Sequence, residues 1–230
     1  MSNLDKKFYK ISGSIFGIMA WIIGFLSFTI AIILRSSVDP NFSLTSKYLC
    51  DLGIEKYDSH FIFSIGFILN KSFLIPFYIS FGFLLQKKIY KSYLIRVAIV
   101  TSIFSMLSLI ILPPFLLDPY NQFSCSMHGI LGFIHFSSAT FAFTLYGIIE
   151  LSNPRISNFY AIVSFITAFM HGFFLVFSPI HLIEWFTIGT DFIWVLIHTV
   201  FLFKSDQTQV QNIVIFELDY LLKYNRRVEK

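Results

Sequence analysis

Residues 178–203, SPIHLIEWFTIGTDFIWVLIHTVFLF, decide the fold of this chain. The stretch is apolar enough to lie in lipid, yet it carries Glu184, Asp191 and His198 at intervals of seven residues. Seven residues make two turns of an α-helix less about 20°, so the three side chains share one stripe. Acidic groups within a membrane span usually face a bundle interior or a wet cavity. We therefore expect this helix to form one wall of a polar seam between helices.

The composition of the whole chain is typical of a membrane protein. Of its 230 residues, 56% are hydrophobic and 13% are charged, whereas soluble domains average about 25% charged residues. Apolar runs of about 20 residues recur along the chain, which predicts an all-α bundle of six transmembrane helices over residues 1–203. The expected spans are about 11–34, 61–85, 97–112, 128–149, 159–177 and 185–203. Residues 204–230 are a predicted tail, in which 210–222 has the spacing of an interfacial helix.

The distribution of basic residues predicts the orientation. Thirteen Lys and Arg flank the spans on the side of the two termini, and three lie in the opposite loops. Because basic residues concentrate on the cytoplasmic side, both termini should be cytoplasmic in a multi-pass protein of the cell membrane or an endomembrane. The net charge of +4 comes from these flanking residues and gives no signal for nucleic-acid binding. The expected partners are membrane lipids, and the oligomeric state is left open.

Polar residues that suit chemistry gather at the predicted outer side. Asp51, His128 and Glu184 are the candidate catalytic groups, because histidines and carboxylates can act as acid and base or hold a metal. They are also candidate binding residues, together with His135, which follows His128 by seven residues on one face of the fourth span. A structural network that pins helix ends together is the alternative.

The same region contains candidate metal ligands. His181 and Glu184 are three residues apart, which is a helical spacing for two ligands, and His128 is a candidate third. No third ligand is fixed by the sequence, however. We therefore predict no cofactor.

Deeper in the bundle, Lys71 and Asp191 are the remaining candidate binding residues. Opposite charges inside a membrane bundle usually pair. The pair could be gated or proton-coupled, and the alternatives are a static salt bridge or a Lys71 side chain that extends toward the interface. His171 and His198 are interpreted as hydrogen-bonded packing residues.

Cys50 and Cys125 are the only cysteines, and both fall in predicted outer loops. An oxidising exterior permits a disulfide between them. The bond would draw Asp51 toward His128, three residues beyond Cys125. Two unbridged thiols packed at the interface are the alternative.

Four segments resemble the multi-pass membrane family known as domain of unknown function 998. They are KISGSIFGIMAWIIGF, FSLTSKYLCDLG, FIFSIGFILNKSFLIPF and, from His128, HGILGFIHFSS. Asp51, Leu52 and Gly53 match its serine-aspartate-leucine-glycine element, whereas Cys50 replaces the serine. The same landmarks, with Glu184 followed by Trp185, are also similar to the family of autophagy modulators and GPI-anchor remodelling factors. Both resemblances imply six helices with polar residues at the outer or luminal side.

Three functional hypotheses follow. The first is a protein without catalysis of its own that binds or senses lipid through an outward polar pocket. The second is a membrane-embedded enzyme that modifies lipids, with a site built from histidine and carboxylates. The third is a small proton-coupled transporter that uses the pair in the bundle interior.

Overall fold

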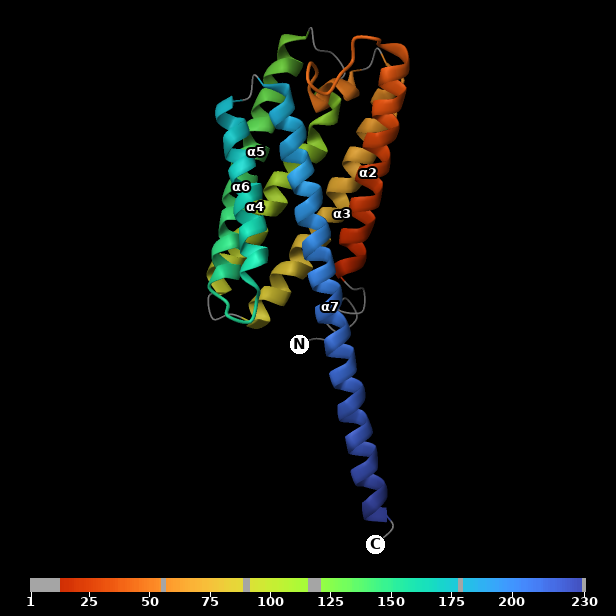
Figure 1. Ribbon diagram of the computed structural model, residues 1–230, viewed down its shortest axis with the longest axis vertical. Helices are drawn as coiled ribbons and strands as arrows, with labels where there is room; N and C mark the ends of the chain where they lie inside the picture. The colour runs from red at the N-terminus through yellow and green to blue at the C-terminus, as the bar shows by residue number, and fades with distance from the viewer. Residues whose placement is uncertain (1–12, 55–56, 89–91, 116–120, 178–179, 229–230) are drawn as a thin grey trace.

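The computed structural model describes residues 13–54, 57–88, 92–115, 121–177 and 180–228, with side chains placed except at 87–88, 92 and 206–228. Within these ranges the chain is helical and has no strand (Figure 1). The long helices are α2 (Gly13–Val38), α3 (Ser59–Lys88), α4 (Ser92–Ile111), α5 (Gln122–Leu151), α6 (Asn158–Phe177) and α7 (His181–Val228). Two short 3-10 helices, η1 (Leu49–Gly53) and η2 (Pro113–Phe115), lie in the connections at one end of the bundle.

All six long helices can cross a membrane by length and hydropathy, α7 doing so over His181–Ser205. Their outward faces carry large apolar side chains, among which Phe61, Phe133 and Phe169 are 63–64% exposed. Such surfaces are suited to lipid, because a helix satisfies its own backbone hydrogen bonds and needs no water. The predicted all-α fold of six transmembrane helices is confirmed, and the chain is a multi-pass integral membrane protein.

The helices form a ring in which each packs against the next in the sequence, and α7 returns to α2. Glycine makes the closest approaches possible on α2. A Cβ on Gly17 would collide with Thr199 Oγ1 of α7, and one on Gly13 would collide with the Ser80 side chain of α3. Small residues at such positions are the usual means by which membrane helices approach each other closely.

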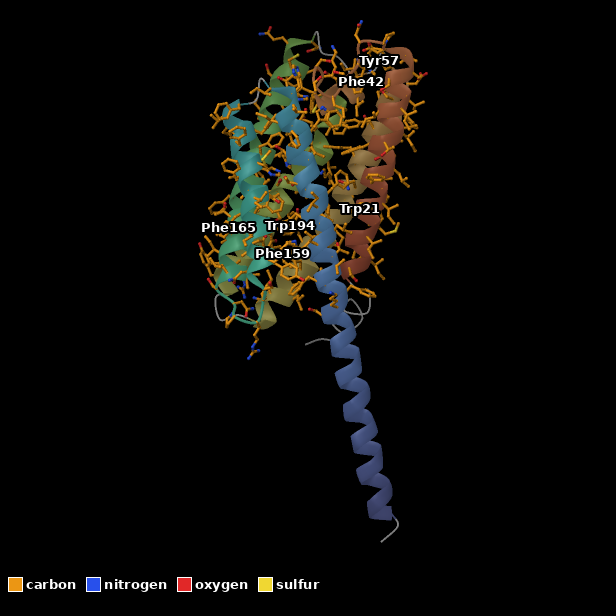
Figure 2. All side chains as sticks on the ribbon, viewed as in Figure 1. Trp21, Phe42, Tyr57, Phe159, Phe165 and Trp194 are labelled. Atoms are coloured by element: carbon orange, nitrogen blue, oxygen red, sulfur yellow. The ribbon has the colours of Figure 1, made fainter. Side chains whose placement is uncertain are left out.

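Aromatic side chains fill the centre of the ring. Trp194 of α7 is fully buried, and Figure 2 shows it within the bundle. Its ring centroid lies 4.9 Å from that of Phe143 and 5.6 Å from those of Phe81 and Tyr146. These separations are in the range of favourable aromatic pairs. The core around Trp194 is therefore built from closely packed aromatic rings.

Helix α5 begins six residues before the start that the hydropathy pattern predicts. Asn121 is its N-cap, and the Asn121 side chain accepts hydrogen bonds from the backbone N–H groups of Phe123 and Ser124. This cap satisfies two of the donors that a helix start leaves free. As a result, Cys125 lies in the first turn of a helix, and His128 lies in its second turn.

Helix α7 continues without a break to Val228 and carries residues 210–222 away from the bundle (Figure 1). The side chains that would define an interfacial face lie outside the described part of the chain. The predicted interfacial helix therefore stays a prediction.

Candidate functional site

Glu184, Asp191 and His198 occupy the inward stripe of α7, as their spacing predicts, and each meets a different partner. Glu184 contacts η1, Asp191 Oδ1 lies 3.4 Å from His171 Nε2 of α6, and His198 contacts Glu150 of α5. One helix thus carries polar contacts at three depths of the bundle, which we call the outer, middle and inner layers.

In the outer layer, Glu184 holds the first loop against α7. Its carboxylate accepts a 2.7 Å hydrogen bond from the backbone N–H of Leu49 and a 3.5 Å hydrogen bond from the thiol of Cys50. Beside it, Trp185 Nε1–H donates to the carbonyl oxygen of Lys47 at 2.9 Å. Glu184 is only 5% exposed, so its hydrogen bonds are shielded from competing water.

The predicted disulfide is not formed, because Cys50 directs its thiol at Glu184 and neither cysteine is bridged. Burial of the thiol, followed by the negative charge of Glu184, raises the pKa of Cys50 well above 9.0. The group is therefore a hydrogen-bond donor at neutral pH, and it satisfies a carboxylate oxygen that a disulfide could not.

A cavity of about 620 Å³ opens at this end of the bundle. The three candidate catalytic residues Asp51, His128 and Glu184 all line it, and His135 lines it further in. The structure thus brings together residues from η1, α5 and α7 that the sequence analysis grouped. The remaining lining residues are Tyr48, Leu49, Cys50, Phe67, Leu109, Leu112, Gly129, Gly132, Phe133, Phe136, Phe174, Leu175 and Ile188.

The candidate metal ligands His181, Glu184 and His128 do not form a ligand set. The ring of His181 packs against Tyr48 with centroids 4.0 Å apart, and Glu184 is already engaged by η1. Among the residues that the structure describes, a different set has converging ligand atoms. The three candidates are therefore not among the described residues whose ligand atoms converge.

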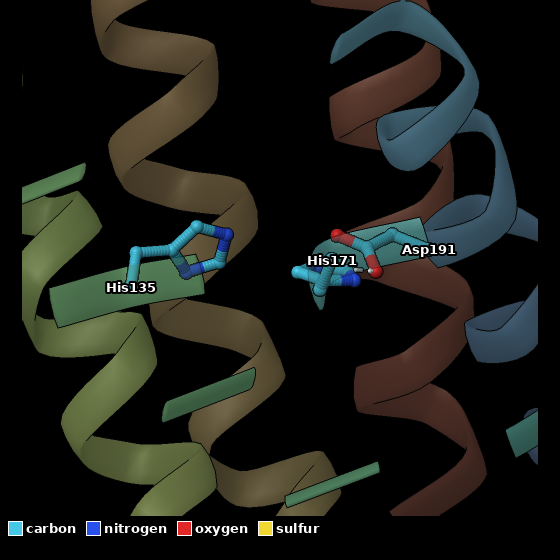
Figure 3. Close-up of side chains that lie close together, drawn as sticks. All are labelled: His135, His171 and Asp191. Carbon is cyan, nitrogen blue, oxygen red and sulfur yellow. Dashed lines mark ion pairs between the residues drawn. The ribbon is translucent and has the colours of Figure 1, made fainter. Parts of the chain in front are cut away.

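That different set is the middle layer, formed by His135, His171 and Asp191 from α5, α6 and α7 (Figure 3). One ligand atom from each lies within 4.8 Å of the other two, and His171 Nε2 is 3.4 Å from Asp191 Oδ1. His135 and His171 are 1% and 0% exposed. Because the His135 ring also lines the cavity, this middle layer adjoins its inner wall.

The expected pair of Lys71 and Asp191 is not a direct ion pair in the described structure. Asp191 pairs with His171 instead, and the Lys71 ammonium lies 5.2 Å from the centre of the Phe67 ring. Lys71 is 4% exposed, so it does not extend to the interface. It is near enough to Asp191 for an electrostatic interaction through the bundle.

The inner layer is a buried network that joins His198, interpreted above as a hydrogen-bonded packing residue, to Glu150 and Ser164, which the sequence analysis did not single out. Glu150 Oε1 lies 2.8 Å from His198 Nε2, and its Oε2 accepts a 2.7 Å hydrogen bond from Ser164. Trp194 Nε1–H donates to the same Ser164 oxygen at 2.8 Å. Each polar side chain in this network has a hydrogen-bond partner, which is typical of a structural network.

The sequence holds only a coarse signal for the middle layer. The connection between α6 and α7 spans residues 178–180, so His171 lies eight residues before its centre and Asp191 twelve residues after it. In an antiparallel helical hairpin, residues equidistant from the turn lie at the same height, so this count leaves the two residues about one helical turn apart. It does not identify His171 as the partner of Asp191.

Comparison with known proteins gives one family. The family described as "Protein of unknown function (DUF998)" matches residues 22–200. No curated protein and no solved structure matches the chain. The similarity to autophagy modulators and GPI-anchor remodelling factors has no match and stays a hypothesis.

Proposed function

This chain belongs to the DUF998 family of proteins of unknown function, and from the shape and chemistry of its cavity we propose that it binds an amphiphile with a cationic or zwitterionic headgroup. The observation that carries the proposal is a cavity whose lining combines two carboxylates, those of Asp51 and Glu184, with apolar side chains. Binding pockets for small molecules commonly measure about 300–1,000 Å³ and combine an apolar wall with a few polar groups. The cavity of about 620 Å³ falls within this range.

The charge of the cavity selects the headgroup. Asp51 and Glu184 contribute two carboxylates, and no Lys or Arg is among the described residues that line it. Burial, and then the negative charges of Glu184 and Asp51, raise the pKa of Tyr48, and these two nearby charges support a preference for a cation. A carboxylate has about four acceptor sites, so both retain capacity beside their present hydrogen bonds. An ammonium group next to carboxylates and a tyrosine ring is favoured, whereas a purely anionic headgroup is not.

The apolar interior suits an acyl chain or another apolar body. Phe67, Leu109, Leu112, Phe136 and Phe174 contribute to its wall. Burying apolar surface here contributes about 25 cal/mol per Å² to binding. Since Glu184 also holds η1, a cation bound at the opening would alter the contact between the first loop and α7, which provides a means of sensing the ligand.

Photo-crosslinking of the protein in lipid nanodiscs tests this proposal. We would use two amphiphiles with the same diazirine-bearing chain, one with a trimethylammonium headgroup and one with a phosphate. Crosslinks to cavity residues, with the trimethylammonium compound preferred, are expected. Equal labelling by both compounds would contradict the assignment of the headgroup.

The chain offers a matched pair of variants for this experiment. A Cβ on Gly132 or on Gly189 meets no atom within 4 Å, but only Gly132 lines the cavity. Gly132→Leu should therefore fill the cavity without disturbing the helix, and Gly189→Leu should leave it open. We expect Gly132→Leu to weaken labelling by about tenfold, which corresponds to 1.4 kcal/mol. Labelling that is equal in the two variants would place the amphiphile outside the cavity.

A second candidate function is modification of the bound amphiphile, and one observation favours it. His135 lines the cavity and also belongs to the buried middle layer with His171 and Asp191. Histidines and a carboxylate in a cavity wall can transfer protons or hold a metal ion that activates water. Mass analysis of isotope-labelled lipids incubated with the wild type and with Asp191→Asn tests this function. Products formed by the wild type alone would support it, and their absence would leave binding as the function.

A further inference from the structure

Three buried side-chain atoms in the middle layer have no hydrogen-bond partner among the described residues. They are Nε2 of His135, Nε2 of His171 and Oδ1 of Asp191. The 3.4 Å between His171 Nε2 and Asp191 Oδ1 does not meet hydrogen-bond geometry. Buried polar atoms are nearly always satisfied in native proteins. Three such atoms within 4.8 Å of one another therefore require a common explanation.

The other hydrogen bonds of the two histidines determine which nitrogen carries the proton. His171 Nδ1 lies 2.9 Å from the carbonyl oxygen of Thr167, which can only accept, so Nδ1 carries the hydrogen and Nε2 has a lone pair in the neutral ring. His135 Nδ1 lies 2.7 Å from Ser105 Oγ, and that hydroxyl donates to the carbonyl oxygen of His135 at 3.3 Å. With its hydrogen directed at that carbonyl, Ser105 Oγ is left to accept from His135 Nδ1–H, and in this tautomer His135 Nε2 also has a lone pair.

We propose that His135, His171 and Asp191 bind a divalent transition-metal ion of the zinc type. Two imidazole nitrogens and one carboxylate oxygen form an established ligand set for catalytic zinc, in which a fourth position stays open. Tetrahedral zinc with bonds of about 2.0–2.1 Å places its ligand atoms roughly 3.3 Å apart. The pair of His171 and Asp191 already has this spacing. Since all three atoms lie within 4.8 Å, His135 needs to approach by at most roughly 1.5 Å.

The hydrogen bonds to Thr167 and Ser105 fit this assignment. Metal-binding histidines almost always donate their second ring N–H to a carbonyl, carboxylate or other polar group, which orients the ring and fixes the tautomer. Both histidines have such a contact here. His135 is one of the residues that line the cavity, so the proposed ion would lie next to the cavity wall.

A proton on His171 is the alternative to a metal ion in the middle layer, and nearby charges affect both. Lys71 and Tyr78, both on α3, interact electrostatically with Asp191. The positive charge of Lys71 opposes a divalent ion. A proton, however, would satisfy only His171 and Asp191 and would leave His135 Nε2 buried without a partner. An ion satisfies all three atoms, so the geometry favours the metal.

Metal analysis of the purified full-length protein tests this inference independently of amphiphile binding. The protein would be stripped with a chelator in detergent, reloaded with Zn²⁺ and desalted, and its zinc content measured by mass spectrometry. We expect about one zinc per chain, as for a single three-ligand site. The variants His171→Gln and Asp191→Asn should lose at least nine-tenths of it. Zinc below a tenth of one equivalent in the wild type would overturn the proposal.

His198→Gln is the matched control, because His198 is a buried histidine of α7 outside the middle layer. It should keep its zinc, and zinc that persists in the two test variants would overturn the assignment of ligands. X-ray absorption of the zinc-loaded wild type covers the case in which a test variant does not fold. It should show two imidazole ligands and one oxygen ligand at about 2.0–2.1 Å, and a spectrum without histidine scattering would exclude this site.

Discussion

Replacing Glu184 with leucine should release η1 from α7. The change removes the carboxylate that accepts the 2.7 Å hydrogen bond from the backbone N–H of Leu49. Leu49 is 2% exposed, so water cannot replace the lost acceptor. A buried donor left without a partner costs about 1–3 kcal/mol. Because 1.4 kcal/mol is a factor of ten in an equilibrium constant, local opening of η1 should become about 5- to 150-fold more frequent. The hydrogen bond from Trp185 to Lys47 remains, so the rest of the fold should persist.

Alkylation of Cys50 measures this opening. Its thiol donates to Glu184, whereas Cys125 is exposed and provides an internal reference in the same chain. Burial, and then the charge of Glu184, raise the pKa of Cys50 well above 9.0. The wild-type thiol therefore stays protonated near neutral pH, and its rate of alkylation should still be rising above about pH 9, because the thiolate is the reactive form. Loss of the carboxylate lowers this pKa, so both effects of Glu184→Leu accelerate the reaction.

Glu184→Gln separates the two effects. Glutamine loses the charge but keeps a carbonyl oxygen that can accept from Leu49 N–H. We expect its alkylation rate to lie between those of the wild type and Glu184→Leu at each pH. The reasoning is refuted if the ratio of Cys50 to Cys125 alkylation is the same in Glu184→Leu as in the wild type, since η1 would then not be held by this carboxylate.

Three further predictions concern packing, the inner network and orientation. Gly17→Leu should lower the thermal unfolding midpoint in detergent, because overpacking typically costs about 1–3 kcal/mol. Gly189→Leu is the control and should leave the midpoint unchanged. Equal midpoints in the two variants would contradict the close contact of Gly17 with α7. Ser164→Ala should destabilise the protein by about 1–3 kcal/mol, because the Trp194 indole N–H loses its acceptor. An unfolding midpoint equal to that of the wild type would show that the inner network does not stabilise the fold. Ser43 is exposed in the first loop, and a cysteine placed there, in a chain without its native cysteines, tests the orientation. It should react with an impermeant maleimide added to intact cells. Labelling only after permeabilisation would reverse the predicted orientation.

The number of helices and the inward stripe of α7 could be derived from the sequence, because each is a local property. An apolar run long enough to cross a bilayer has few alternatives to a helix, and seven-residue spacing places Glu184, Asp191 and His198 on one face whatever surrounds them. The cost of a carboxylate in lipid then directs that face inward. The grouping of Asp51, His128 and Glu184 around the cavity also follows, since helix ends on one side of the membrane must lie near each other.

The partners of these residues were decided by the tertiary structure. Asp191 meets His171 and Cys50 meets Glu184, where the sequence analysis expected Lys71 and Cys125. Charge and residue type state only that a buried group needs a partner. Which group supplies it depends on how the helices rotate and at what height they pack, and this is determined by contacts such as Gly17 against Thr199. The ligand atoms of His135, His171 and Asp191 lie close together for the same reason: three consecutive helices have to be in register before the site exists.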